Sequence, residues 1–342
     1  MPAFRSRWVT RFGNEAGRIR YVGQRLDGPE LDEHEQVSEA VVECVPNFSE
    51  GTDVRRVEAI VSAMRTDGVR LLDWSMDADH NRSVVTIAGA PAAVVESAVR
   101  GVGKAVELID LTRQHGVHPR IGAADVIPFV PVSGIKLEQC VMLARQAGAE
   151  IWERFGVPVF FYEAAASRPD RANLEDVRRG QFEGLRDEVN RDPARRPDLG
   201  GPGLHPTAGA CAVGARKFLV AYNVYFASAS VAVVRSIARE IRAASGGLKG
   251  VKALGMLVHG RAQLSMNITD FQVTPLATVY GKIEELAERH KVAIAEGEVI
   301  GLIPEAACER ESAWMRQLSE FDPQAKILEH RLKSPLAWPA GR

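Results

Sequence analysis

The chain has 342 residues, of which 46% are hydrophobic and 25% are charged, the balance of a globular protein that buries a substantial core in one large or two ordinary domains. Its formal net charge of -1 argues against a nucleic-acid-binding protein that relies on a basic surface. The four cysteines lie far apart in the sequence, which indicates reduced thiols in a cytoplasmic protein and argues against a zinc site of the cysteine type.

The N-terminal stretch, residues 1–38, is rich in arginine but has no apolar run of the kind found in a signal peptide. We therefore expect a loosely ordered extension there. The longest apolar-rich run, residues 218–234, is interrupted by Asn223 and by serines. Such a run predicts a buried strand followed by a helix, and no membrane span.

The first half of the chain predicts alternating short strands and helices. Apolar runs rich in β-branched residues predict strands at residues 41–46, 69–73, 83–88, 126–132 and 157–162. Helical spacing of apolar residues predicts helices at 54–64, 92–109 and 136–155. The first of these helices follows a capping aspartate, Asp53, and the last is stopped by Gly156.

Residues 163–213 differ from both flanks because they combine prolines, many charges and a glycine cluster, with one predicted helix near 174–189. From residue 218 the earlier order of elements returns. We expect strands at 218–226, 251–258, 262–269 and 292–298, and helices at 230–244, 275–290 and 304–320. A tail is expected after the last helix.

The repeated β-α-β-β-α-β order predicts an α+β protein with two similar ferredoxin-like subdomains, mostly antiparallel sheets and a ligand groove between them. The expected division is an extension at residues 1–38 and a first subdomain with its linker at 39–213. A second subdomain at 214–304 and a helix with a tail at 305–342 complete it.

The connection between the helix at 92–109 and the strand at 126–132 is strongly polar, with His115, His118, Arg120 and Asp125 separated by glycine and proline. An imidazole exchanges protons near neutral pH, and an arginine binds a carboxylate through two hydrogen bonds. We therefore expect the active site here. A structural loop whose polar groups satisfy one another is the plain alternative. A metal site at His115, His118 and Asp125 also stays open, although the two histidines do not share a helical face.

A second polar cluster lies between two predicted strands and contains Asp77, Asp79, His80, Asn81 and Arg82. These side chains either cap a hairpin through mutual hydrogen bonds or supply a carboxylate that stabilises a developing positive charge.

The third cluster is the glycine-rich segment 200–209, followed by Arg216 and Lys217. Glycines let backbone amides approach a flat ligand closely, and the two cations are suited to carboxylates. The segment lacks the GxxxxGK[ST] pattern of a phosphate loop and the GxGxxG pattern of a dinucleotide site. Without other motifs it is equally well an interdomain linker.

Taken together, the motifs resemble those of one family, the glutamate formiminotransferases, which are folate-dependent transferases of histidine breakdown. The resemblance rests on Glu43-Cys-Val-Pro-Asn-Phe-Ser-Glu-Gly51, His80-Asn-Arg-Ser83, His118-Pro-Arg-Ile-Gly122 with Asp125, and Gly214-Ala-Arg-Lys-Phe-Leu-Val-Ala-Tyr-Asn223. It extends from about residue 41 to about residue 304. It implies a stand-alone member without the cyclodeaminase domain, with a folate groove between two similar subdomains and a homodimeric assembly.

The resemblance also implies roles for individual residues. His118 matches the catalytic histidine of the family, and its carboxylate partners are expected to be Asp125, Asp77 and Asp79. The expected folate-binding residues are Gly200, Gly201, Pro202, Gly203, Leu204, His205, Pro206, Thr207, Ala208 and Gly209. The expected substrate-binding residues are Asn47, Arg82, Arg120 and Arg216.

The implied reaction moves a formimino group between N-formimino-L-glutamate and tetrahydrofolate, with no metal and no nucleic-acid or membrane partner. The folate is polyglutamylated or not, and a separate cyclodeaminase is expected for the next step of this one-carbon pathway. Three alternatives remain. The first is a related enzyme that uses another formimino donor or 5-formyltetrahydrofolate, the second a non-catalytic folate-binding module, and the third a metal-dependent hydrolase.

Overall fold

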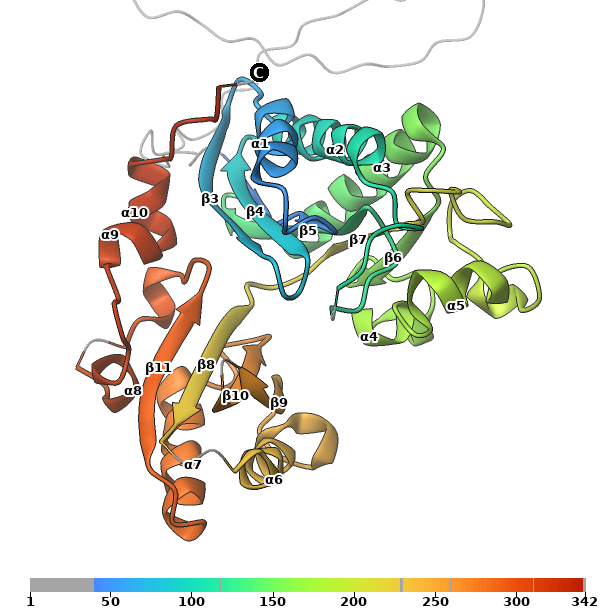
Figure 1. The fold of residues 1–342 in the computed structure, drawn as a ribbon. Helices are drawn as coiled ribbons and strands as arrows, with labels where there is room; N and C mark the ends of the chain where they lie inside the picture. Colours follow the sequence, from blue (N-terminus) through green and yellow to red (C-terminus); the bar gives the residue numbers. More distant parts are fainter. Residues whose placement is uncertain (1–39, 117, 228–229, 259, 310, 341–342) are drawn as a thin grey trace, which may run out of the picture. The chain divides into compact units, whose positions relative to one another are not determined.

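The computed structural model describes residues 40–116, 118–227, 230–258, 260–309 and 311–340 (Figure 1). The extension predicted at residues 1–38 lies outside the described residues. The strands are β1 (Val41–Cys44), β2 (Asn47–Phe48), β3 (Val69–Asp77), β4 (Arg82–Gly89), β5 (Ala124–Ser133), β6 (Val159–Glu163), β7 (Cys211–Ala215), β8 (Val220–Phe226), β9 (Val251–Val258), β10 (Arg261–Ile268) and β11 (Ile294–Ile300). The helices of at least one α-turn are α1 (Val54–Ala63), α2 (Pro91–Leu108), α3 (Leu137–Phe155), α4 (Leu174–Val177), α5 (Gln181–Glu188), α6 (Val231–Ile241), α7 (Leu276–Arg289), α8 (Ala313–Arg316), α9 (Pro323–Lys326) and α10 (Leu328–Lys333).

In the described part of the chain, β1 to β7 form a seven-stranded sheet. Its pairings are antiparallel except for β5 with β7 and β6 with β7, which are parallel. Helices α1, α2 and α3 pack side by side and cover one face of this sheet (Figure 1). Asp53 accepts a hydrogen bond from the backbone N–H of Arg55 and Gly156 ends α3 in the left-handed conformation, so both predicted helix boundaries are confirmed.

The strand β7 is absent from the sequence-based prediction, which leaves residues 163–213 as an irregular connection with one helix. The segment Cys211-Ala-Val-Gly-Ala215 is small and has a single β-branched residue, so its sequence gives little strand signal. It lies between β5 and β6, where both of its faces are buried. The predicted helix near 174–189 is two short helices, α4 and α5, separated by Gly180 in the left-handed conformation.

A second sheet follows the order β8-α6-β9-β10-α7-β11, as the sequence predicts. Its four strands among the described residues are arranged β11-β8-β10-β9 and every pairing is antiparallel. Tyr222 and Trp314 are among the largest buried side chains of its core. The predicted α+β class with two mostly antiparallel sheets is confirmed, and the first half contains two strands, β2 and β7, that the sequence does not predict.

The single helix predicted at 304–320 is wrong. Glu311 has a left-handed backbone, which an α-helix does not accommodate, and Ser312 behind it caps the separate short helix α8. The predicted tail instead contains α9 and α10. Within the described ranges, no helix combines the length and apolar character needed to cross a lipid bilayer.

Candidate active site

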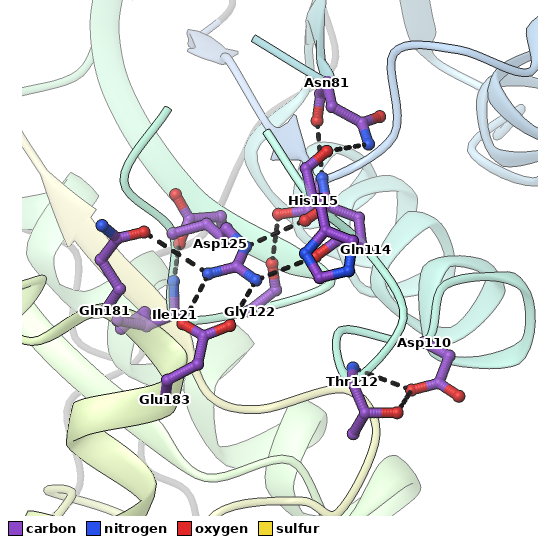
Figure 2. Close-up of polar contacts among 12 residues, drawn as sticks. Asn81, Asp110, Thr112, Gln114, His115, Ile121, Gly122, Asp125, Gln181 and Glu183 are labelled. Carbon is purple, nitrogen blue, oxygen red and sulfur yellow. Dashed lines mark hydrogen bonds and ion pairs between the residues drawn. The ribbon is translucent and has the colours of Figure 1, made fainter. Parts of the chain in front are cut away.

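The polar connection between α2 and β5 is fixed to the β3–β4 turn by side chains of both segments. Asn81 donates from Nδ2 to the carbonyl of His115 at 2.7 Å, and Gln114 donates from Nε2 to the carbonyl of Asn81 at 3.0 Å (Figure 2). A Cβ added at Gly116 would lie 2.5 Å from the carbonyl oxygen of His80, so only glycine lets the two backbones approach this closely. The connection is therefore held rigidly just before His118.

Arg120 holds the other end of this connection. Its Nε donates to Oε1 of Gln114 at 2.9 Å, and its two terminal nitrogens donate to the Glu183 carboxylate at 2.8 and 2.7 Å. The remaining N–H groups reach Gln181 at 3.4 Å and the Gln114 carbonyl at 3.0 Å, and Figure 2 shows Gln114, Gln181 and Glu183 turned toward the same group. Each guanidinium N–H thus has a protein acceptor, so in this arrangement Arg120 positions the loop and has no donor left for a substrate carboxylate.

His118 has both ring nitrogens engaged. Nδ1 lies 2.7 Å from the carbonyl oxygen of Pro119, which accepts only, so the proton is on Nδ1. Nε2 then carries the lone pair and accepts a hydrogen bond from Nη1 of Arg82. Burial, together with the charges of Arg82 and Arg178, lowers the pKa of His118 to about 4. The ring is therefore neutral at cellular pH, with Nε2 as its basic atom.

Asp125 is 3% exposed at the start of β5 and uses both carboxylate oxygens within the protein. Oδ1 accepts the backbone N–H of Ile121 at 2.7 Å, and Oδ2 is paired with the guanidinium of Arg178, which follows α4. Both oxygens of Asp125 are thus occupied, and Asp125 makes no hydrogen bond to the imidazole among the described residues. It acts on His118 only through space, where its negative charge favours the charged form of the ring. Sequence reasoning missed Arg178, which lies in the stretch interpreted as a linker.

Four buried polar atoms, on β2, on β4 and at the end of α4, have no hydrogen-bond partner among the described residues. They are Nε of Arg82, Nε of Arg178, Oδ1 of Asn47 and Oγ of Ser83. Burial and the charge of Arg178 lower the pKa of Arg82 to about 10. A hollow of about 200 Å³, with its open mouth included, is lined by Phe48, Ser49, His80, Asn81, Arg82, His118, Arg120 and Asp125. Buried donors and acceptors without partners are costly, which indicates that a polar ligand completes this site.

The two aspartates of the β3–β4 turn differ in their surroundings. Asp77 lies opposite Arg82 in the ladder of β3 and β4 and accepts the backbone N–H of His80 at 2.9 Å. Its second oxygen lies 3.0 Å from Nδ1 of His80. Burial raises the pKa of Asp77, but the contacts with His80 outweigh it and lower the pKa overall. Asp79 is exposed at the tip of the turn.

The predicted folate segment divides into two parts. His205 to Gly209 form a tight turn that lies against the His118 connection, since Ala208 accepts the N–H of Ala123 at 2.9 Å and Gly209 bridges Gly122. Gly200 lies instead against the ring of Trp152 on α3, where a Cβ would come within 2.6 Å of the indole. The structure therefore brings the second part of the segment, but not Gly200, to the neighbourhood of His118.

Of the predicted substrate residues, Arg82 contacts His118 and Asn47 lies on β2 beside Phe48, which lines the same hollow, but Arg216 lines a separate hollow. This second hollow, of about 590 Å³ including its open mouth, is lined by Leu137, Glu163, Ala164, Ala215, Arg216, Lys217, Leu219, Thr269 and Asp270. Lys217 and Asp270 form an ion pair at 2.5 Å on its wall. No group of three or more His, Cys, Asp and Glu side chains suited to a metal ion occurs among the described residues, His115, His118 and Asp125 included.

Comparisons with known proteins address the chain as a whole. Residues 41–216 match the N-terminal subdomain of the formiminotransferase domain, and residues 221–317 match the formiminotransferase domain. The glutamate formimidoyltransferase of Streptococcus pyogenes serotype M1 is 42% identical over 295 residues, which cover 85% of this chain and 98% of the relative. The protein of the same name from Thermoplasma acidophilum is 42% identical over 299 residues, 86% of this chain and 98% of the relative. The formimidoyltransferase-cyclodeaminase of Gallus gallus is 41% identical over 275 residues, 78% of this chain and 51% of the relative. The chain therefore belongs to the formiminotransferase family.

Proposed function

We propose that the chain transfers the formimino group of N-formimino-L-glutamate to N5 of tetrahydrofolate, giving L-glutamate and 5-formiminotetrahydrofolate. The observation that supports this most directly is the neutral imidazole of His118, whose basic Nε2 lies beside a hollow lined by Arg82, a residue whose buried Nε has no acceptor in the part of the chain that the structure describes. Two relatives that are 42% identical over 98% of their own length carry the name glutamate formimidoyltransferase.

His118 acts as the general base and then as the general acid. N5 of tetrahydrofolate attacks the formimino carbon, and Nε2 of His118 takes the proton that leaves N5. The bond between the carbon and the glutamate nitrogen then breaks, and the same proton passes from Nε2 to the departing nitrogen. Nδ1 keeps its proton throughout because its N–H donates a hydrogen bond to the carbonyl oxygen of Pro119 at 2.7 Å, which also fixes the orientation of the ring.

The carboxylates stabilise positive charge on the formimino group during the transfer. Asp125 is the first candidate for this role, because its negative charge already acts on His118 and Arg82 through space. Asp77 holds His80, whose ring lies 6.2 Å from that of His118, and so positions one wall of the hollow. Asp79 is exposed and is assigned a weaker role.

The substrates are bound by groups on both sides of His118. Arg82 and Asn47 bind the donor, because each offers a buried polar atom without a partner. The turn of His205 to Gly209 presents its backbone to the folate, with the rest of the segment 200–209 as its continuation. Arg216 receives a carboxylate of the folate tail, polyglutamylated or not, in the second hollow.

In the cell we expect the protein to act as a cytoplasmic homodimer in histidine degradation. A cyclodeaminase on another chain would consume the 5-formiminotetrahydrofolate. The near-complete coverage of the two relatives named glutamate formimidoyltransferase supports this placement. Light scattering of the purified protein measures its oligomeric state.

A transfer assay tests the proposal. Purified protein is supplied with tetrahydrofolate and N-formimino-L-glutamate, and both the folate product and released glutamate are followed. We expect wild-type turnover and a loss of about 10²–10⁴-fold in kcat for His118→Ala, the usual contribution of a general base. The matched control is His115→Ala, because His115 is exposed on the same connection and should keep its rate.

Other outcomes contradict the proposal in different ways. A rate that survives His118→Ala would move the base elsewhere, and equal losses in both variants with sensitivity to chelators would favour the metal-dependent alternative. Folate binding without turnover would indicate either a non-catalytic folate-binding module or an enzyme that uses another donor, such as formiminoglycine.

A further inference from the structure

The guanidinium groups of Arg82 and Arg178 both act on His118, and Asp125 is the carboxylate that pairs with Arg178. Arg178 and Asp125 are paired, with side chains only 12% and 5% exposed. Arg178 lies close enough to Arg82 and His118 to lower the pKa of both groups. The carboxylates that act on these two cations are Asp125 and Asp77 on Arg82, and Asp125 and Glu175 on Arg178. Asp77 is itself paired with His80 on the β3–β4 turn.

Each of these guanidinium groups has an unused donor that is buried. Among the described residues, neither Nε of Arg82 nor Nε of Arg178 has an acceptor, and Asp125 is the sole hydrogen-bond partner of the Arg178 guanidinium. Arg120 provides the contrast, because each of its N–H groups is satisfied by protein acceptors. Buried guanidinium donors without acceptors call for an anion with paired oxygens, such as a carboxylate.

The hydrogen bond from Arg82 to His118 has a chemical consequence. While Nη1 of Arg82 donates to Nε2, the lone pair of Nε2 is occupied and the adjacent positive charge opposes protonation. A base held in this state does not take a proton from a folate. An anion that attracts the Arg82 guanidinium removes both obstacles together.

We propose that Arg178 and Arg82 together bind the α-carboxylate of the formimino donor, and that this carboxylate draws Arg82 away from Nε2 of His118. The donor thereby uncovers the base that its own reaction requires. This inference rests on the proposed function, because it names how that site recognises its donor. The α-carboxylate is chosen over the side-chain carboxylate because it is attached to the carbon that carries the departing nitrogen, which must lie within reach of Nε2.

The first test uses the wild-type protein and needs no substitution. Histidine side chains are labelled with ¹⁵N, and the protonation of His118 is followed by NMR from acidic to neutral pH. The probes are L-glutamate, L-glutamine, L-isoglutamine and 5-formyltetrahydrofolate. L-Glutamate and L-glutamine, which keep the α-carboxylate, should raise the proton affinity of His118 by about tenfold or more, the effect of one nearby opposite charge. L-Isoglutamine, whose α-carboxylate is an amide, should leave it unchanged.

Two results of this experiment would overturn the proposal. A response to L-isoglutamine equal to that of L-glutamate would assign the site to the side-chain carboxylate. A response to 5-formyltetrahydrofolate with none to L-glutamate would assign it to the folate tail.

The second test uses variants of Arg178 and of its neighbour Arg179, which is exposed. Arg178→Met should weaken L-glutamate binding, measured by calorimetry, about ten- to hundredfold, the contribution of a charge-assisted hydrogen bond. Arg178→Met should also abolish the rise in the proton affinity of His118 that L-glutamate causes. Arg178→Lys keeps the charge beside Asp125, so it preserves the fold where Arg178→Met fails to fold, yet it lacks the paired N–H groups and should also bind weakly. Arg179→Met is the matched control and should behave as wild type.

Failure of this inference is distinguishable from failure of the proposed function. If the Arg178→Lys protein binds L-glutamate as wild type does and still transfers the formimino group, the inferred carboxylate site is contradicted and the proposed function is not. If the wild-type protein transfers no formimino group but L-glutamate still raises the proton affinity of His118, the proposed function is contradicted and the inferred carboxylate site is not.

Discussion

Glu43 shows what a single buried charge does to this protein. It is 2% exposed on β1, on a strand whose neighbours Val42 and Cys44 belong to the core. Burial raises the pKa of its carboxyl from 4.5 to about 7, while the charge of Arg216 lowers it and that of Glu329 raises it. Between these two pH values the folded protein binds a proton that the unfolded chain releases. The stability that this proton provides is present below pH 4.5 and is lost as the pH rises through about 7.

Glu43→Gln should therefore have a pH-dependent effect. The amide cannot ionise, so the variant should match wild type in acid and exceed its free energy of unfolding above neutral pH. The gain is at most about 3–4 kcal/mol, the equivalent of the full shift in pKa. Urea unfolding at two pH values measures it, with Glu153→Gln at an exposed position of α3 as the control. A difference between Glu43→Gln and wild type that does not change with pH would contradict the prediction.

At the level of residues, the sequence identified the polar groups near His118 better than it identified their partners. Side-chain chemistry and loop position favour His118, Arg82 and Asp125 because charged groups rarely enter a core alone. The partner of Asp125 is Arg178, 53 residues further along the chain, and nothing local to either residue encodes that pairing. The same limit applies to Arg120, whose acceptors come partly from α5.

At the level of elements, two glycines should respond oppositely to the same substitution. A Cβ at Gly116 would lie 2.5 Å from the backbone of His80, so Gly116→Ala should displace the His118 connection and reduce kcat.

Gly281 lies inside α7 with nothing within 4 Å of its Cβ position. Gly281→Ala should stabilise the protein by about 0.5–1 kcal/mol, because alanine is the better helix former. Thermal unfolding and the transfer assay check both, and a Gly116→Ala enzyme with wild-type kcat would show that the connection is not rigid.

The elements that were predicted correctly are those with strong periodic signals. The second sheet has β-branched strands and amphipathic helices, so its β-α-β-β-α-β order could be read from hydrophobic spacing. Strand β7 could not, because Cys211-Ala-Val-Gly-Ala215 owes its conformation to pairing with β5 and β6. The break before α8 depends on the backbone of Glu311, a residue type that usually continues a helix.

For the molecule as a whole, the described residues form two main apolar cores, one on the seven-stranded sheet and one on the four-stranded sheet. A small cluster joins elements that are far apart in the sequence, with Leu72 of β3 and Ala88 of β4 packed against Leu302 and Leu328. Leu336 continues this contact by donating its N–H to the carbonyl of Leu71 at 2.8 Å. The segment from α10 onward therefore links the end of the chain to the first sheet.

Leu328→Ala should show how far this small cluster couples the two cores. Leu328 is 2% exposed, so its truncation should cost about 2–4 kcal/mol through lost burial and the cavity that remains. Because the cluster contains few side chains, the loss should appear as separate unfolding of the two sheets, with amides of α10 and β3 exchanging first. Hydrogen exchange with urea unfolding measures both effects. The control is Leu257→Ala on β9, where the side chain is 58% exposed and little stability should be lost. Unfolding of Leu328→Ala in a single transition, with uniform loss of amide protection, would mean that the two cores are coupled through other contacts.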